Sequence, residues 1–277
     1  SRKKSSTRIK ADREFFKTKM KIRLIPILYF KDGNLVRSEN FDIHQILGDP
    51  FVQVAKYNQW NIDEIIYLDI SKSKNFQIKN KTDSNIKNFL DVIKKASKQS
   101  FSPMVFGGGI NNLSDAKTYF QSGADKISIN SAIIENMEII SEFANIFGSQ
   151  SIVASVDVKK VGGMYKIYNS KNDEIYDYNL HQFLIDIEKK GAGEILLNSV
   201  DRDGTGEGYD IELIKKVYEV LNIPLIPCGG VGIFDHFSDI LEEIDLTAVS
   251  AGNIFNFTER SYEKAKIFLK KKGLNFR

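Results

Sequence analysis

The feature that most constrains the fold of this chain is an eightfold alternation of short apolar stretches with amphipathic stretches after Met20. Strands that alternate with helices in this way form βαβ units and a parallel sheet. Eight units in a chain of 277 residues predict a closed (β/α)8 TIM barrel. An open doubly wound sheet is the alternative, but no G-x-G-x-x-G motif opens a first helix. The predicted strands are Ile22–Leu28, Glu64–Ile70, Pro103–Phe106, Lys126–Ile129, Ile152–Val156, Glu194–Asn198, Pro224–Pro227 and Thr247–Ala251.

Internal repeats support the closed barrel. The segment Pro103–Gly109 returns as Pro224–Gly230, and Gly123–Asn130 resembles Asp245–Asn253. Matching segments in the two halves of a chain indicate a duplicated architecture. We therefore expect two half-barrels of four units each, fused head to tail.

Composition indicates the extent of the folded domain and excludes several classes of protein. Residues 1–19 are rich in Lys, Arg and Ser, so we expect a disordered N-terminal extension ahead of a single barrel at residues 20–277. A net charge of +3 is too small to predict nucleic-acid binding. No apolar run reaches the roughly 18 residues of a membrane helix. The single cysteine, Cys228, excludes an internal disulfide and fits a cytoplasmic protein.

The three histidines, His44, His181 and His236, do not have the spacing of metal ligands, so we predict no metal and no cofactor. Cys228 stands beside a glycine pair, but no histidine is placed in the sequence to activate it. A small buried residue is the expected role of this cysteine.

The active sites of barrels of this type lie at the C-terminal ends of the strands. Any single polar residue there is explained equally well by a turn or a helix cap. A whole set at corresponding strand ends instead predicts a site at the barrel mouth. The set comprises Tyr29, Asp69, Gly107, Gly108, Gly109, Asn130, Ser131, Asp157, Asn198, Asp203, Gly204, Gly229, Gly230, Gly252 and Asn253.

The two glycine clusters in this set allow backbone N–H groups to approach an anion closely. With Asn130-Ser131 in one half and Gly252-Asn253 in the other, they predict two phosphate sites on opposite sides of the mouth. The ligand would then carry two phosphates, or descend from one that did. The alternative is that the glycines only shorten the turns.

Charged residues mark both ends of the predicted barrel. Asp157 ends an apolar strand, so burial is expected to raise its pKa and suit it to proton transfer; the alternative is a turn cap. At the other end, charges open strands one, two, four and six, and their spacing alone favours a salt-bridge network that closes the floor. These four residues are Arg23, Glu64, Lys126 and Glu194.

Seven motifs are spread over the chain from about Lys21 to Arg277. They are Lys31-Asp32-Gly33, Gly48-Asp49-Pro50, Phe106–Gly109, Gly123–Asn130, Phe147–Gln150, Gly191–Leu197 and Asp201–Thr205. Together they resemble one known family, the cyclase subunit of imidazole glycerol phosphate synthase, of histidine biosynthesis. The resemblance implies a barrel that forms a heterodimer with a class I glutamine amidotransferase glutaminase docked on its floor. Ammonia would pass through the barrel to a phosphorylated substrate at the mouth.

The resemblance also assigns roles to single residues. It implies that the four floor charges form an ammonia gate, which replaces the simpler interpretation as a floor network. It implies that Asp125 lies at the glutaminase interface and that Asp157 is one of two catalytic aspartates. The substrate-binding positions that it implies are Asp69, Asn130, Ser131, Asp203 and Gly204.

The sequence departs from the family at the end of strand one, where Tyr29 replaces the other catalytic aspartate. A tyrosine has an unperturbed pKa of about 10 and is a poor base at neutral pH. Loss of a general acid–base group typically costs ~10²–10⁴ in rate. Asn198 also replaces a usual threonine, and Arg37-Ser38-Glu39 a usual Lys-Gly-Thr.

These changes favour a paralogue that still receives ammonia but passes it on. The expected recipient is a separate sugar amidotransferase, which converts an N-acetyl group to an acetamidino group in surface-polysaccharide biosynthesis. The alternatives are a true histidine-biosynthesis cyclase, a related phosphoribosyl isomerase, and a non-catalytic scaffold that activates a glutaminase.

Overall fold

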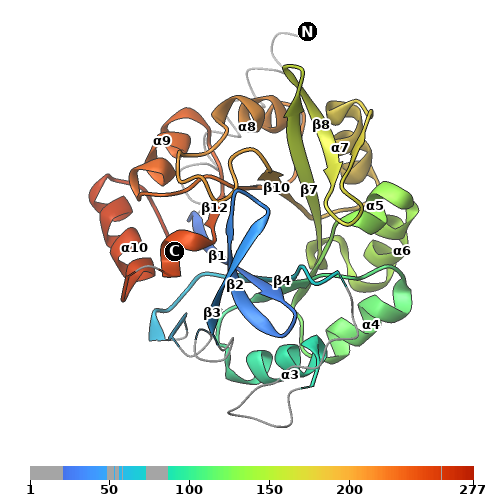
Figure 1. Cartoon of the computed structure of the whole chain (residues 1–277), viewed down its shortest axis with the longest axis horizontal. Coiled ribbons are helices and arrows are strands. Elements are labelled where there is room, and N and C mark those ends of the chain that lie inside the picture. The colour runs from blue at the N-terminus through green and yellow to red at the C-terminus, as the bar shows by residue number, and fades with distance from the viewer. Residues whose placement is uncertain (1–20, 49–52, 54–55, 58, 73–86, 257) are drawn as a thin grey trace, which may run out of the picture.

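The computed structural model describes residues 21–48, 53, 56–57, 59–72, 87–256 and 258–277. Within them, eight strands and the helices outside them form the predicted (β/α)8 barrel (Figure 1). Every predicted strand is present, which confirms the fold assignment. The barrel strands are β1 (Arg23–Lys31), β4 (Ile65–Asp69), β5 (Met104–Gly107), β6 (Lys126–Ile129), β7 (Ile152–Val161), β10 (Glu194–Ser199), β11 (Leu225–Cys228) and β12 (Ala248–Ala251).

The barrel closes around strand β1, which pairs in parallel with β4 on one side and with β12 on the other. Parallel ladders then run from β4 through β5, β6, β7 and β10 to β11. The seam between β11 and β12 contains Pro227, which has no N–H to donate. The Ser250 hydroxyl bridges this seam by donating to the Pro227 carbonyl at 2.6 Å.

Several of the helices begin at side-chain caps that the sequence supplies locally. Asn88, Asn112 and Asn179 each accept a hydrogen bond from a backbone N–H in the first turn of the helix that follows, which satisfies a group that would otherwise lack a partner. The helices are α3 (Phe89–Gln99), α4 (Leu113–Gln121), α5 (Ser131–Glu135), α6 (Glu138–Phe147), α7 (Leu180–Lys189), α8 (Ile211–Tyr218), α9 (Asp235–Glu243) and α10 (Ser261–Lys271). None of the described helices is long and apolar enough to cross a membrane.

Alternation along the strands divides the apolar core into two layers. Outward-facing side chains pack with the helices in one large cluster. Inward-facing side chains fill the barrel interior in a second cluster, as is usual for barrels of eight strands. We call this second cluster the inner column; it consists of Ile25, Ile27, Ile66, Val105, Val153, Leu196, Ile226, Cys228 and Ala248, with Tyr29 and Leu68 packed against it.

Two β-hairpins extend the barrel at its mouth, and the sequence analysis did not predict them. The first, β2 (Asn34–Glu39) with β3 (Ile43–Gly48), follows β1, and the second, β8 (Met164–Asn169) with β9 (Glu174–Tyr176), follows β7. Their first turns, Asp32-Gly33 and Gly162-Gly163, have positive φ at both residues. Asp-Gly and Gly-Gly turns of this kind are a sequence signal for hairpins, so the signal was present.

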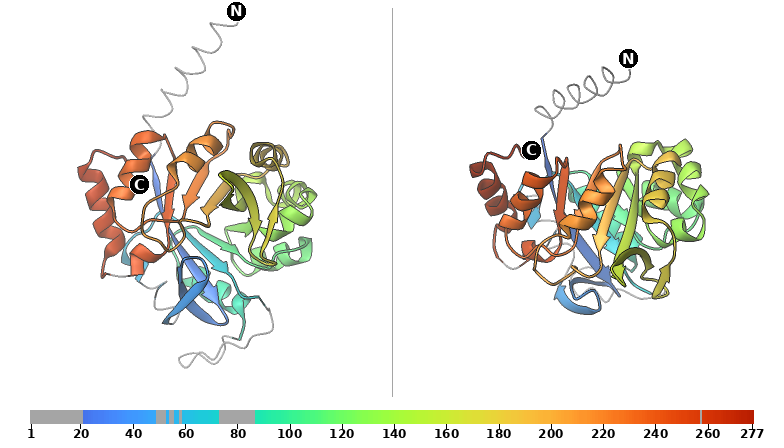
Figure 2. Two further views of the ribbon diagram at one scale, coloured as in Figure 1. Left: turned by 45° about the horizontal axis from the view of Figure 1, so that its top comes forward. Right: turned by 90° about the horizontal axis from the view of Figure 1, so that it is seen from above.

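The two hairpins follow the first and fifth barrel strands, the same place in each half-barrel, which agrees with the predicted repeat. The hairpin β2–β3 crosses the centre of the barrel in Figure 1. In the right-hand view of Figure 2 it lies at the opposite end of the barrel from the start of β1. We call the end with this hairpin the mouth and the end where the barrel strands begin the floor.

The seam between β11 and β12 can be tested with Ser250→Ala. The variant leaves the carbonyl of the buried Pro227 without its hydroxyl donor, so the free energy of unfolding should fall by about 1–3 kcal/mol. Ser114→Ala, at an exposed position of α4, is the matched control and should change little. Equal unfolding midpoints for the two variants in urea would show that the hydroxyl does not close the barrel.

Candidate functional site

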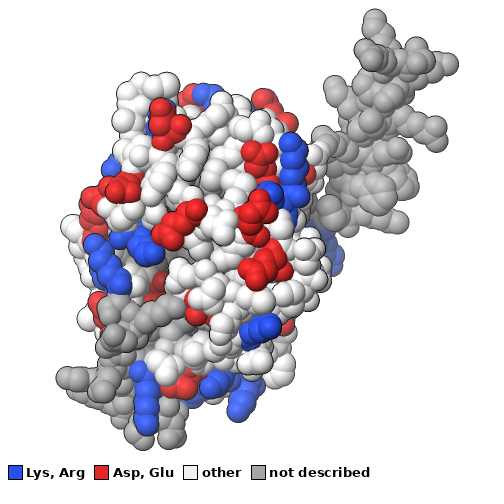
Figure 3. Space-filling model, turned by 90° about the vertical axis from the view of Figure 1, so that its right-hand side faces the viewer, with Lys and Arg blue, Asp and Glu red and all other residues white. Residues whose placement is uncertain are grey.

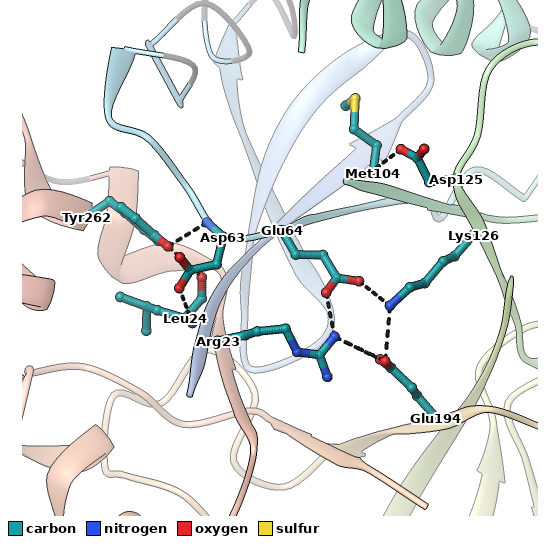
Figure 4. Close-up of polar contacts among 9 residues, drawn as sticks. All are labelled: Arg23, Leu24, Asp63, Glu64, Met104, Asp125, Lys126, Glu194 and Tyr262. Carbon is teal, nitrogen blue, oxygen red and sulfur yellow. Dashed lines mark hydrogen bonds and ion pairs between the residues drawn. The ribbon is translucent and has the colours of Figure 1, made fainter. Parts of the chain in front are cut away.

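Four charged side chains meet on the barrel axis at the floor (Figure 4). Arg23 contacts Glu64 at 2.5 Å and Glu194 at 3.1 Å. Lys126 contacts the same two carboxylates, at 2.8 and 3.0 Å. The four form a closed ring in which cations and anions alternate, called the floor ring below. The spacing argument for a salt-bridge network at this end is confirmed.

The floor ring has no net charge and is largely removed from water. Glu64 and Arg23 are buried, and each carboxylate has two cationic partners. Such compensation is required, because an isolated buried charge is strongly destabilising. Burial acts to lower the pKa of Arg23, but Glu64 and Glu194 raise it above its ordinary value.

Two further aspartates hold the ends of the strands that carry the ring. Asp63 precedes Glu64 and accepts hydrogen bonds from the Leu24 backbone N–H at 2.9 Å and from Lys266 at 2.7 Å. Asp125 precedes Lys126 and accepts from the Met104 backbone N–H at 2.8 Å. Each aspartate therefore binds the first residues of a neighbouring strand. The sequence analysis missed Asp63.

Asp125 was predicted to lie at a partner interface. Its side chain is exposed on the floor, and only one of its carboxylate oxygens is used by Met104. The other oxygen remains available to a second protein, so the interface role stays a prediction. Its local role is to join the starts of β5 and β6.

At the mouth, Asp157 is held between two amides. Asn130 donates to one of its carboxylate oxygens and Asn198 to the other, both at 3.1 Å. Asp157 is 7% exposed. Burial raises the pKa of Asp157 to about 6, although the hydrogen bonds from the amides oppose the shift. The predicted direction of this shift is confirmed.

Asp203 supplies a second buried carboxyl group at the mouth. Burial raises its pKa to about 6; the hydrogen bond from Ser38 at 2.9 Å opposes this shift, and the charge of Asp157 adds to it. The sequence analysis assigned Asp203 to substrate binding alone. A pKa of about 6 also suits it to proton transfer near neutral pH.

Tyr29 occupies the top of the inner column, with its hydroxyl 3.6 Å from the Cys228 sulfur. Its ring lies beside Gly252, where a Cβ would come within 3.3 Å of it. Burial raises the pKa of Tyr29 well above 10, and Cys228, Asp203 and Asp157 add to the shift. Tyr29 is therefore a neutral phenol, as expected of a poor base.

Cys228 is buried, and burial raises the pKa of its thiol to about 12. The expectation of a small buried residue is confirmed. Among the described residues, no group of three or more His, Cys, Asp or Glu side chains is arranged to hold a metal ion.

The glycine clusters bring the mouth loops into close backbone contact. A Cβ on Gly108 would collide with the Asp69 backbone, and one on Gly230 would collide with the Gly208 carbonyl. Gly208 N–H donates to the Gly230 carbonyl at 2.7 Å. These contacts support the alternative that the glycines shape the turns, and the predicted phosphate sites stay a prediction.

The hairpin β2–β3 is bound to the C-terminal half of the mouth. Ser38 donates to Asp203, and Asn253 donates to the Ser38 carbonyl at 2.5 Å. The backbone of the hairpin lies against Gly204, where a Cβ would collide with Asn40. The predicted ligand-binding residues Asp203, Gly204 and Asn253 thus hold this hairpin in place.

The remaining predicted residues lie around the N-terminal half of the mouth. Asp69 accepts from the Ser71 backbone N–H at 3.0 Å, and Ser131 donates to Asn169 at 3.0 Å. Asn169 is fully buried, and its side-chain nitrogen has no hydrogen-bond partner among the described residues. Sequence analysis missed Asn169, which follows no motif.

The raised pKa of Asp157 predicts a pH dependence of stability. The folded chain keeps the proton up to about pH 6, whereas the unfolded chain releases it near the ordinary value of 3.8. Stability therefore falls as pH rises from about 4 to 6, by about 3 kcal/mol for a shift of about two pKa units. Asp157→Asn cannot ionise and lacks this penalty.

We expect the unfolding free energy of Asp157→Asn, relative to the unmodified chain, to rise between pH 4 and pH 7. Denaturant unfolding at each pH measures it. Asp239→Asn, at an exposed position of α9, is the control and should show a constant difference. A difference that does not change with pH for Asp157→Asn would contradict the raised pKa.

Comparison of the sequence with known proteins identifies the family of this chain. Residues 23–261 match the family described as histidine biosynthesis protein. A chain of Vibrio vulnificus (strain YJ016), whose name hisF2 assigns it provisionally to the imidazole glycerol phosphate synthase subunits, is 39% identical over 258 residues, 93% of this chain and 92% of that one.

Two chains named imidazole glycerol phosphate synthase subunit HisF are similar to this chain at comparable identity. That of Chlorobium phaeovibrioides (strain DSM 265 / 1930) is 37% identical over 255 residues, and that of Clostridium botulinum (strain 657 / Type Ba4) is 39% identical over 260. Each alignment covers 92% of this chain and 98% of the relative. The chain therefore belongs to the histidine biosynthesis protein family, among the HisF-like cyclase subunits of imidazole glycerol phosphate synthase.

Proposed function

We propose that the chain is the synthase subunit of a glutamine amidotransferase complex. It receives ammonia from a class I glutaminase docked on the floor and conducts it along the barrel axis to a phosphate-bearing site at the mouth. The observation that carries this proposal is the floor ring, which stands on the axis below an apolar column that leads to Asp157.

The floor ring has the properties of a gate. Its members hold one another on the axis, so a molecule can enter only when one of them moves. Lys126 is the most exposed member, at 18% of its side chain, and it has a long flexible stem. Its ammonium group can swing away while Arg23 still neutralises part of the charge of Glu64 and Glu194.

The inner column favours a small neutral molecule. Its side chains are apolar from Ile25 to Ile226, so an ammonium ion would lose its hydration without gaining a counter-charge. Neutral ammonia pays a smaller desolvation cost than the ion. At the mouth, Asp157 with a pKa of about 6 is largely ionised at pH 7 and can accept a proton.

Tyr29 supports the paralogue that supplies ammonia for sugar amidation. Cyclisation in this family uses two aspartates. Here Asp157 is one of these positions, and the other, at the end of strand one, holds Tyr29, a neutral phenol next to Cys228. The similarity to a chain named hisF2 is compatible with a paralogue. The recipient would be a sugar amidotransferase that converts N-acetyl to acetamidino groups in surface-polysaccharide biosynthesis.

One observation favours the alternative, a true cyclase of histidine biosynthesis. Asp203 is buried near Asp157, and burial raises its pKa to about 6. A second carboxyl group with this pKa could supply the acid–base function that Tyr29 lacks. The two functions differ in the rate of cyclisation that they require.

Complementation separates these two functions. In a histidine auxotroph that lacks the cyclase, we expect no growth from the unmodified chain, since loss of the acid–base group lowers the rate by ~10²–10⁴. Tyr29→Asp should raise the measured cyclase rate, and Tyr29→Phe is the control that should not. Growth with the unmodified chain would establish the histidine-biosynthesis function instead.

The gate is tested in a reconstituted system of this chain, a class I glutaminase and the sugar amidotransferase. Lys126→Met leaves the ring with an excess negative charge, so product formed from glutamine should fall about tenfold, equal to about 1.4 kcal/mol. Product formed from added ammonium salt at the mouth should not change.

Lys264→Met, at an exposed position of α10, is the matched control. An equal loss with glutamine and with ammonium salt would mean that Lys126 has no part in ammonia transfer. Stimulation of glutamine hydrolysis without any transferred nitrogen would favour the glutaminase-activating scaffold.

A further inference from the structure

Phe101 is the most exposed large hydrophobic side chain in the described part of the molecule, at 97%. It lies in the loop between α3 and β5, which ends where β5 begins and so belongs to the floor. A phenyl ring held entirely in water forgoes the free energy that burial would give. Aromatic side chains are enriched in the buried cores of protein–protein interfaces.

The loop that carries Phe101 is firmly attached. Ser102 donates to the Ile62 carbonyl at 2.7 Å, and Ser100 donates to the Ser102 carbonyl at 2.9 Å. The Pro103 carbonyl accepts from Ile65 N–H at 3.0 Å. Phe101 is therefore displayed on a fixed platform, and docking would immobilise little additional chain.

The loop that carries Phe101 is attached to the segment that carries Glu64 of the floor ring. Ile62 and Ile65, which hold the loop, flank Asp63 and Glu64 in the sequence, and Glu64 is a member of the ring. On the other side of β5, Asp125 binds the Met104 N–H and exposes its carboxylate on the same face. An aromatic side chain, a carboxylate and the entrance to the inner column thus share one surface.

A second exposed apolar side chain lies toward the same end of the barrel. Ile146, 51% exposed, lies at the end of α6, shortly before β7 begins on the floor. The side of the molecule shown in Figure 3 has Lys, Arg, Asp and Glu interspersed over its described residues. An aromatic anchor with a charged residue at its side is the usual composition of an energetic hot spot.

We propose that Phe101 anchors the glutaminase subunit on the floor, with its ring in an apolar pocket of that subunit. This inference rests on the proposed function and adds the residue on which docking depends. The floor ring indicates the occupant, because only a partner seated over this entrance can deliver ammonia without losing it to solvent. A second copy of this chain would instead seal two such entrances against each other.

The test is isothermal titration of the full chain with each purified class I glutaminase of its source organism. We expect one of them to bind the unmodified chain at 1:1 stoichiometry and Phe101→Ala to raise its Kd by about 30-fold or more. Because the ring is exposed, the variant should unfold at an unchanged midpoint. Phe101→Leu, which keeps an apolar group, should retain part of the affinity.

Two matched controls remove exposed apolar side chains elsewhere on the molecule. Ile267→Ala changes a residue of α10, and Met164→Ala changes a residue of the β8–β9 hairpin at the mouth; both variants should leave Kd unchanged. Unchanged Kd for Phe101→Ala, or a larger loss for Met164→Ala, would overturn the anchor while leaving the complex intact. Failure of every glutaminase to bind the unmodified chain would overturn the proposed function, and the anchor with it.

A second copy of this chain is the alternative occupant of this face. Self-association of the unmodified chain that is lost in Phe101→Ala would show that the second copy covers it, and would overturn the assignment to a glutaminase.

Discussion

The structure depends above all on the compensation of four charges on the barrel axis. Arg23, Glu64, Lys126 and Glu194 come from four different places in the chain and satisfy one another within 3.1 Å. Buried charges tolerate little displacement, since each lost contact leaves an unpaired ion. The strands that carry the ring must therefore keep their register, and the hydrogen bonds of Asp63 and Asp125 to neighbouring strands help to keep it.

Desolvation controls the opposite end of the barrel in a different way. At the floor, burial is offset by opposite charges, whereas at the mouth it is offset only by neutral donors such as Asn130 and Asn198. The carboxyl groups of Asp157 and Asp203 respond by raising their pKa to about 6. One chain thus holds a ring of mutually compensating charges and a pair of buried carboxyl groups with raised pKa, separated by an apolar column.

The duplication is visible beyond the barrel strands. Hairpins follow β1 and β7, and their turns use Asp32-Gly33 and Gly162-Gly163. The two hairpins nevertheless make different contacts. The first hairpin is bound across the mouth through Ser38, and its Phe41 ring meets Tyr168 of the second hairpin edge-on at 5.8 Å. Both turn signals are present in the sequence, so the two hairpins are predictable from local residues.

The sequence by itself determined the eight strands, the capped helices, the repeat and the floor charges, because these follow from local periodicity and from residues next in the chain. Tertiary structure decided which distant residues meet: Tyr29 reaches Cys228 across 199 positions, and Ser38 reaches Asp203 across 165. The burial that raises the pKa of Asp203, and the full exposure of Phe101, likewise depend on how the closed barrel places each loop. No local pattern encodes these properties, because water is excluded from a side chain only when segments distant in sequence pack around it.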